Sequence, residues 1–247
     1  MNADQVTGTL LLLIAAFVPS LAVLFWLRWG VRGKKERWDD LILTFIGGAV
    51  VAVIIATILE LIAAELLYST VVREYQLFVR EPTILTFLAI IVVAPFIEEF
   101  AKVLVVRNFS RYIWRPRNGL IFGAACGLGF AATENFLYES TVLFEEGLIA
   151  FLVLAFVRSI SSSLMHAAST SVSGYGVARA KSYGVHWWPY YLIAVLMHAS
   201  FNLFASLGEF FSGELGAATS VYGLVISVAL VVVAFLYLRW RISGYNA

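Results

Sequence analysis

Acidic and imidazole side chains that can activate water occur in four successive apolar stretches of the chain. They are Glu98, Glu99, Glu134, His166 and His198. Ionisable groups inside hydrocarbon are costly unless they are paired or hydrated, so such residues are functional candidates by default. Carboxylates can serve as general base and general acid, and an imidazole can stabilise an oxyanion. These residue types therefore fit hydrolysis of a peptide bond inside a membrane.

Further polar residues stand at helical spacing from these groups. Lys102 follows Glu98 by four residues and Glu99 by three, so the ammonium and a carboxylate share a helix face. We expect Lys102, Asn135 and Asn202 to support the chemistry rather than to perform it. The candidate catalytic residues are Glu98, Glu99, Lys102, Glu134, Asn135, His166, His198 and Asn202.

A metal site is an alternative for the same residues. The chain has no HExxH zinc signature. A zinc site could still be assembled from separate helices, and its ligands would then be His166, His198, Glu134 and Glu98.

Composition indicates where these residues must act. Of the 247 residues, 61% are hydrophobic and 13% are charged, and the mean hydropathy is +0.88. An ordinary soluble domain is about half apolar and about a quarter charged. A soluble globule, a disordered chain and a collagen-like fibre are therefore excluded, and a polytopic membrane protein remains. We expect the protein to be surrounded by a lipid bilayer. We expect no nucleic-acid partner.

Seven apolar stretches are long enough to span a membrane, because a helix needs about 20 residues to cross about 30 Å of hydrocarbon. We expect an all-α protein with one integral-membrane domain over 1–247 and the motif-bearing spans within 83–208. The predicted spans are 8–28, 41–68, 83–106, 119–138, 148–178, 189–208 and 217–238.

Charge sets the predicted orientation. Most Lys and Arg residues follow the first, third, fifth and seventh spans, whereas Arg73 and Arg80 flank the opposite ends. The positive-inside rule then places the N-terminus outside and the C-terminus in the cytoplasm.

Depth separates two groups of buried polar residues, since a helix rises about 1.5 Å per residue. The five acids and histidines named at the outset fall in one layer near mid-membrane. Glu60, Glu65 and Arg158 lie nearer the outer face, where we expect them to have a structural role, either as ion pairs or by extending their charged ends to the interface. Pro95 is expected to kink its span and to free a backbone carbonyl just before Glu98.

Four ordered motifs resemble a known family. They are EEFAK at 98–102, FAATENFLY at 130–138, HAASTSVSGYG at 166–176 and HASFN at 198–202. In this order and on successive spans they resemble the PrsW family of intramembrane proteases. That family is grouped with the CAAX prenyl endopeptidases, the bacteriocin-processing proteins and, more distantly, the scaffold subunit of gamma-secretase.

The resemblance implies an intramembrane endopeptidase in a prokaryotic plasma membrane, cutting a membrane-associated protein substrate in the manner of the first cut of an anti-sigma factor. Glu98, Glu99, His166 and His198 would be catalytic, Glu134 would help to hold water or metal, and Asn202 would orient His198. Asn202 stands where the family pattern has Asp, and Asn is a poor metal ligand. We therefore expect no cofactor, with zinc as the alternative.

Two other functions remain open at this point, and so does the oligomeric state. One is a non-catalytic membrane scaffold or substrate-gating subunit that keeps the polar core. The other is a proton-coupled transporter, since transporters also bury Glu, His and Lys.

Overall fold

The computed structural model describes residues 3–31, 34–67, 69, 82–216 and 218–243, and within these ranges it contains helices and no strands. Six helices are long and apolar enough to cross a membrane, or seven if the bent pair at 188–213 is counted as one span. The predicted all-α class with about seven spans is confirmed. The protein is a multi-pass membrane protein.

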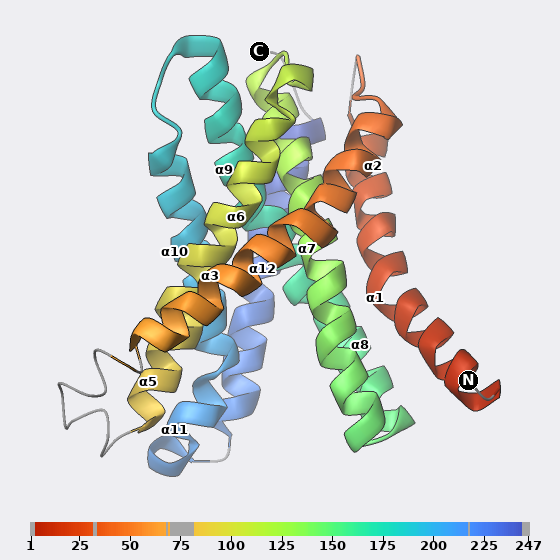
Figure 1. Ribbon diagram of the computed structural model, residues 1–247, viewed down its shortest axis with the longest axis vertical. Helices are drawn as coiled ribbons and strands as arrows, with labels where there is room; N and C mark the ends of the chain where they lie inside the picture. Colours follow the sequence, from red (N-terminus) through yellow and green to blue (C-terminus); the bar gives the residue numbers. More distant parts are fainter. Residues whose placement is uncertain (1–2, 32–33, 68, 70–81, 217, 244–247) are drawn as a thin grey trace.

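Several spans consist of more than one helical segment (Figure 1). In chain order the segments are α1 (Ala3–Trp29), α2 (Trp38–Ile46), π-helical η1 (Gly47–Ala52), α3 (Val53–Leu66), α5 (Pro82–Leu88), π-helical η3 (Ala89–Val93), α6 (Ala94–Asn108), 3-10 helix η4 (Ser110–Tyr112), α7 (Pro116–Glu145), α8 (Leu148–Ile160), α9 (Ser162–Tyr183), α10 (Trp188–Ala205), α11 (Leu207–Leu215) and α12 (Thr219–Ser243).

Helix α7 is the central helix of the bundle. Its most apolar stretch is 78% buried, against 22–39% in the other five candidate spans. Three of its glycines, Gly119, Gly123 and Gly127, recur every four residues and face the backbone of α9. A Cβ added at Gly123 would lie 2.3 Å from the carbonyl oxygen of Thr170. Small residues thus let two helices that carry site residues approach backbone to backbone.

The segment η1 packs against the opposite side of α7 in the same way. A Cβ added at Gly48 would lie 2.0 Å from the carbonyl oxygen of Cys126, and one added at Gly129 would lie 1.9 Å from that of Phe45. The continuous α2–η1–α3 span crosses the bundle obliquely in front of α6 and α7 (Figure 1). Helix α7 is therefore held between α9 and η1.

The fifth predicted span, 148–178, is found as one candidate span over Leu148–Tyr183. It consists of two helical segments, α8 and α9, because the backbone at Ser161 (φ −114°, ψ −76°) departs from regular helix geometry. Gly147, with φ +90°, makes the turn from α7 into α8 that a residue with a Cβ would resist. Both segments pack against α7, and α9 does so more extensively than α8.

The third span contains a π-helical segment immediately before Pro95. The N–H of Ala94 donates to the carbonyl of Ala89, five residues earlier, instead of four. Pro95 has no N–H and cannot continue that pattern, so the carbonyl of Ile90 loses its donor. The predicted freed carbonyl is present, and the π-helical segment is how the span accommodates the proline.

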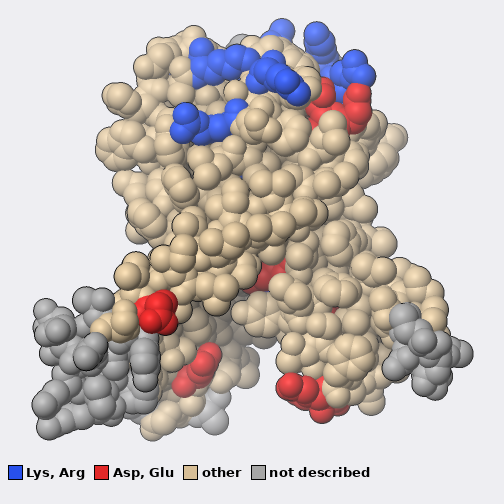
Figure 2. Space-filling model, viewed as in Figure 1, with Lys and Arg blue, Asp and Glu red and all other residues tan. Residues whose placement is uncertain are grey.

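Basic residues gather at one end of the molecule, and acidic residues lie mainly on the other half (Figure 2). The last turns of four spans contribute to the basic end through Arg28, Arg107, Lys181 and Arg241. Arg73 and Arg80, which the charge pattern assigns to the other side, lie outside the described residues. The first described span begins at the end opposite to the one where the last finishes (Figure 1). The cytoplasmic assignment of the basic end stays a prediction.

Replacing Gly123 by Ala is expected to destabilise the fold, because the new methyl group would overlap the backbone of α9. Overpacking costs about 1–3 kcal/mol. Thermal unfolding in detergent measures the loss. The control is Gly213→Ala, where a Cβ meets no atom within 4 Å. Equal melting temperatures for the two variants would contradict the backbone contact.

Candidate functional site

The ammonium of Lys102 lies at the centre of a buried polar cluster. Its Nζ donates to Glu98 Oε2 at 3.1 Å, to Glu99 Oε1 at 3.0 Å and to His166 Nδ1 at 2.7 Å. The side chain has no exposed surface, and the ring of Phe130 lies 4.0 Å from the Nζ. An ammonium has three hydrogens to donate, so these three acceptors use all of them.

The two adjacent glutamates occupy different environments. Glu99 is fully buried and also accepts hydrogen bonds from Ser169 and Thr170, each at 3.1 Å. The Glu98 side chain is 11% exposed, and among the described residues its only hydrogen-bond partner is Lys102. Glu99 is therefore a saturated anion, whereas Glu98 keeps an oxygen free for a further partner.

His166 connects the ammonium to Glu134. Its Nε2 lies 2.7 Å from Glu134 Oε2, on the opposite side of the ring from Lys102. Because an ammonium can only donate, Nδ1 must accept, and a neutral ring then carries its proton on Nε2. The surrounding groups thus select one tautomer of His166, with Nε2–H donating to Glu134.

His198 is the second buried imidazole and has an unsatisfied nitrogen. Its ring stands edge-on to that of His166, with centroids 4.9 Å apart. The Nδ1 lies 3.3 Å from Glu99 Oε1, but the geometry is not that of a hydrogen bond, and this atom has no hydrogen-bond partner. His198 therefore has a nitrogen available for a ligand or a substrate.

Arg158 corrects one expectation from the sequence. It does not pair with Glu60 or Glu65 at the outer face but with Glu134, through Nη2 and Oε1 at 3.3 Å. Its Nε donates to Asn135 Oδ1 at 2.7 Å. Depth estimated along single spans did not show that Arg158 on α8 lies beside Glu134 on α7.

The predicted contact between Asn202 and His198 is wrong. The Asn202 amide instead donates to the carbonyl of Ile90 at 2.9 Å. This is the carbonyl that Pro95 leaves without a donor. Asn202 thus stabilises the π-helical entry to α6 instead of the ring of His198.

Three of the residues could hold a metal ion. The ligand atoms of Glu98, His166 and His198 all lie within 4.8 Å of one another. Two imidazoles and a carboxylate are a known ligand set for catalytic zinc, and the free Nδ1 of His198 supports the fit. Glu134, which the predicted zinc set included, lies outside this group. His166 would have to exchange one of its two present contacts for the ion.

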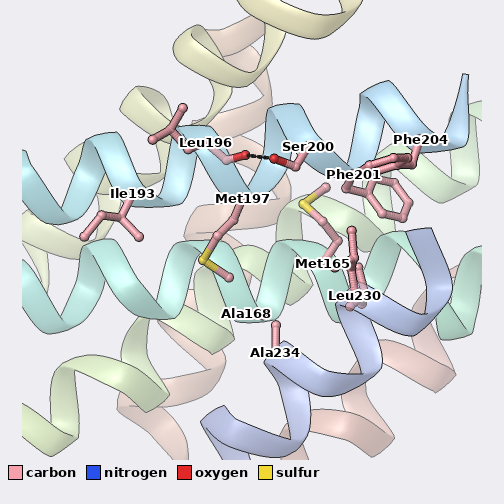
Figure 3. Close-up of a pocket in the computed structure, with 11 residues that line it drawn as sticks. Met165, Ala168, Ile193, Leu196, Met197, Ser200, Phe201, Phe204, Leu230 and Ala234 are labelled. Carbon is pink, nitrogen blue, oxygen red and sulfur yellow. Dashed lines mark hydrogen bonds between the residues drawn. The ribbon is translucent and has the colours of Figure 1, made fainter. Parts of the chain in front are cut away.

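An apolar cavity of about 470 Å³ borders the cluster without containing it. Met165 and Met197, the residues before the two histidines, point into it from α9 and α10, and Leu230 and Ala234 of α12 close it (Figure 3). Its polar side chain, Ser200, donates to the carbonyl of Leu196 at 2.7 Å. No ionisable group lines this cavity, so it is not the place where water is activated.

Comparison with protein families identifies the chain. It matches the PrsW family intramembrane metalloproteases over residues 36–237. The chain belongs to this family. A search of curated proteins and a search of solved structures each gave no match. As a PrsW family member the protein is a membrane-embedded peptidase, and its family is described as metal-dependent.

The sequence did not identify all the residues that shape the PrsW site. Arg158 was assigned to the outer face, and Ser169, which was not among the candidate residues, donates to Glu99. Phe130 stacks on Lys102. An in-span arginine was the one available signal for Arg158, since such a residue needs a partner.

Asn202→Ala is expected to lower stability, because it leaves the partly buried Ile90 carbonyl unpaired at a cost of about 1 kcal/mol or more. Thermal unfolding in detergent measures it. The control is Ser200→Ala, which removes a hydroxyl bonded within its own helix. A variant of unchanged stability that no longer cleaves substrate would restore the catalytic role for Asn202.

Proposed function

We propose that the protein is an intramembrane endopeptidase in which Glu98 activates the attacking water between His166 and His198. The observation that carries this proposal is the convergence of α6, α7, α9 and α10 on one buried cluster of acids, imidazoles and an ammonium. Within the cluster Glu98 and Glu134 keep exposed surface, 11% and 25% of their side chains. The other site carboxylate, Glu99, keeps none.

Glu98 is the general base. A base must reach a water molecule and must have an oxygen that is not already used. Glu98 meets both conditions, whereas Glu99 accepts from Lys102, Ser169 and Thr170. Glu99 instead positions the ammonium, which stabilises negative charge on both carboxylates.

The reaction then proceeds by proton transfers among these groups. Glu98 takes a proton from water as the water oxygen bonds to the scissile carbonyl carbon. An N–H of His198 stabilises the oxyanion of the tetrahedral intermediate. Glu98 returns the proton to the leaving nitrogen as the carbon–nitrogen bond breaks.

Zinc is the alternative activator that the family description favours. Glu98, His166 and His198 would hold it, and a bound zinc ion would supply Lewis acidity and a water of lowered pKa. Lys102 and Glu134 would then position His166 from either side of its ring.

We propose a membrane-associated protein as the substrate, because the site lies among the spans. An anti-sigma-factor-like protein cut at its first site in a prokaryotic plasma membrane is the specific form of this proposal. The basic end of the bundle would face the cytoplasm.

Glu98→Gln is expected to lower the rate of cleavage of a single-span membrane substrate by about 10²–10⁴-fold, the usual contribution of a general base. Purified protein and substrate in vesicles, with product followed by electrophoresis, give the rate. Glu65→Gln is the matched control, because Glu65 is an exposed carboxylate on α3.

Cleavage by Glu98→Gln at the unaltered rate would rule out this role. Failure of the unaltered protein to cut any membrane substrate, combined with pH-driven solute uptake in the same vesicles, would favour the transporter.

Removal of metal by a chelator distinguishes activation of water by Glu98 from activation by zinc. Both nitrogens of His166 already have partners, so we expect cleavage by side chains alone and an unchanged rate after dialysis against a zinc chelator. Metal analysis of the purified protein accompanies the assay. Loss of activity that added zinc restores would contradict the metal-free mechanism and would leave the peptidase assignment intact.

A further inference from the structure

We propose that Arg158 is a positioning residue for catalysis, which fixes the carboxylate of Glu134 and, through it, the orientation of the His166 ring. The inference rests on the proposed function and extends it to a residue outside the four sequence motifs. It also assigns a task to the α8–α9 break, where Arg158 lies three residues before Ser161.

The two oxygens of Glu134 are divided between two partners. Oε1 lies 3.3 Å from Nη2 of Arg158, and Oε2 lies 2.7 Å from Nε2 of His166. A carboxylate held at one oxygen by a fixed cation presents the other in a defined direction. Arg158, Glu134 and His166 thus form a chain that ends at the catalytic imidazole.

Arg158 is itself held on several sides. Its Nε donates to Asn135 Oδ1 at 2.7 Å, and its Nη2 lies 3.2 Å from the hydroxyl of Ser162. Its guanidinium carbon lies 4.2 Å from the centre of the Tyr138 ring. Asn135 donates in turn to Ser163 at 3.0 Å. A planar group with several donors is suited to contacts of this kind, and a lysine ammonium cannot reproduce all of them.

Two cations therefore bracket His166 from opposite directions. Lys102 donates to Nδ1 directly, and Arg158 acts on Nε2 through Glu134. Without Arg158, Glu134 keeps no cation of its own among the described residues and is free to rotate from the ring. Partners one step from a functional histidine typically contribute about 10–100-fold to activity.

A purely structural role is the competing explanation, because the same side chain joins α7, α8 and α9. The two roles differ in what they predict. A structural tie lowers the melting temperature and acts independently of Glu134. A positioning residue lowers the turnover number, and its effect disappears once Glu134 is altered.

The experiment compares Arg158→Gln, Arg158→Lys, Glu134→Gln and the double variant Arg158→Gln/Glu134→Gln, using the full chain in vesicles with the membrane substrate. We expect Arg158→Gln to lower kcat by about 10–100-fold with KM little changed. Arg158→Lys, which keeps the charge, should recover part of that loss. The double variant should be no slower than Glu134→Gln alone.

A spectroscopic measurement tests the contact between Glu134 and His166 directly and does not depend on turnover. The chain has three histidines, so selective ¹⁵N-histidine labelling resolves His166. Lys102 keeps the proton on Nε2 in both proteins, so we expect the Nε2–H resonance to show a hydrogen bond to a carboxylate in the unaltered protein and to shift, as that bond weakens, in Arg158→Gln. The control is Arg179→Gln, which removes a partly buried arginine that bonds Tyr190 at the far end of α9 and should change neither kcat nor this resonance.

Three results would overturn the inference. They are a normal kcat in folded Arg158→Gln, multiplied losses in the double variant, and an unchanged His166 Nε2–H resonance in Arg158→Gln. Should Arg158→Gln fail to fold, Arg158→Lys provides the same comparisons of kcat and resonance. These failures are distinct from failure of the proposed function, because Glu98→Gln would still slow cleavage.

Discussion

A fully buried ammonium is the constraint on which the rest of the structure depends. An unpaired charge in this environment would be strongly destabilising, so Lys102 requires acceptors on every side. Glu98 and Glu99 come from its own helix, but His166 comes from α9 and must be brought to it. The contact between Lys102 and His166 therefore requires α6 to pack against α9 and α7. A change that separates these helices leaves a charge without partners, which links stability of the fold to integrity of the site.

The backbone of α7 and the two π-helical segments make this convergence possible. Glycines at four-residue intervals bring α7 into backbone contact with α9, and that closeness places Glu134 beside His166. The π-helical segment before Pro95 and the amide of Asn202 set the start of α6. Irregular backbone at membrane depth is tolerated where other protein groups satisfy it, and here those groups lie next to the site they support.

The hydrogen bonds of the site residues indicate which of them position others and which take part in the reaction. Glu99 and Lys102 have all their hydrogen-bonding capacity used and no exposed surface, so they hold the other side chains in place. Glu98 retains a free oxygen and some exposed surface, and His198 retains a buried nitrogen without a hydrogen-bond partner, so these two groups are open to water or substrate. Arg158 and Glu134 extend the network toward the α8–α9 break. A membrane peptidase needs both kinds of residue, because Glu98 and His198 must contact the reacting water while the fully bonded residues keep other water out of the site.

The sequence by itself determined the class of protein, the approximate spans and most of the polar cluster. Apolar length and the cost of buried charge are local properties, and they identified Glu98, Lys102, His166 and His198 without coordinates. The tertiary structure decided which groups meet. Asn202 bonds Ile90 rather than His198, and Arg158 bonds Glu134 rather than an outer acid. The first contact depends on the departure from regular helix geometry before Pro95, and the second on how α7 and α8 lie side by side. Depth counted at a constant rise along one span includes neither, because both are set by the packing of neighbouring helices.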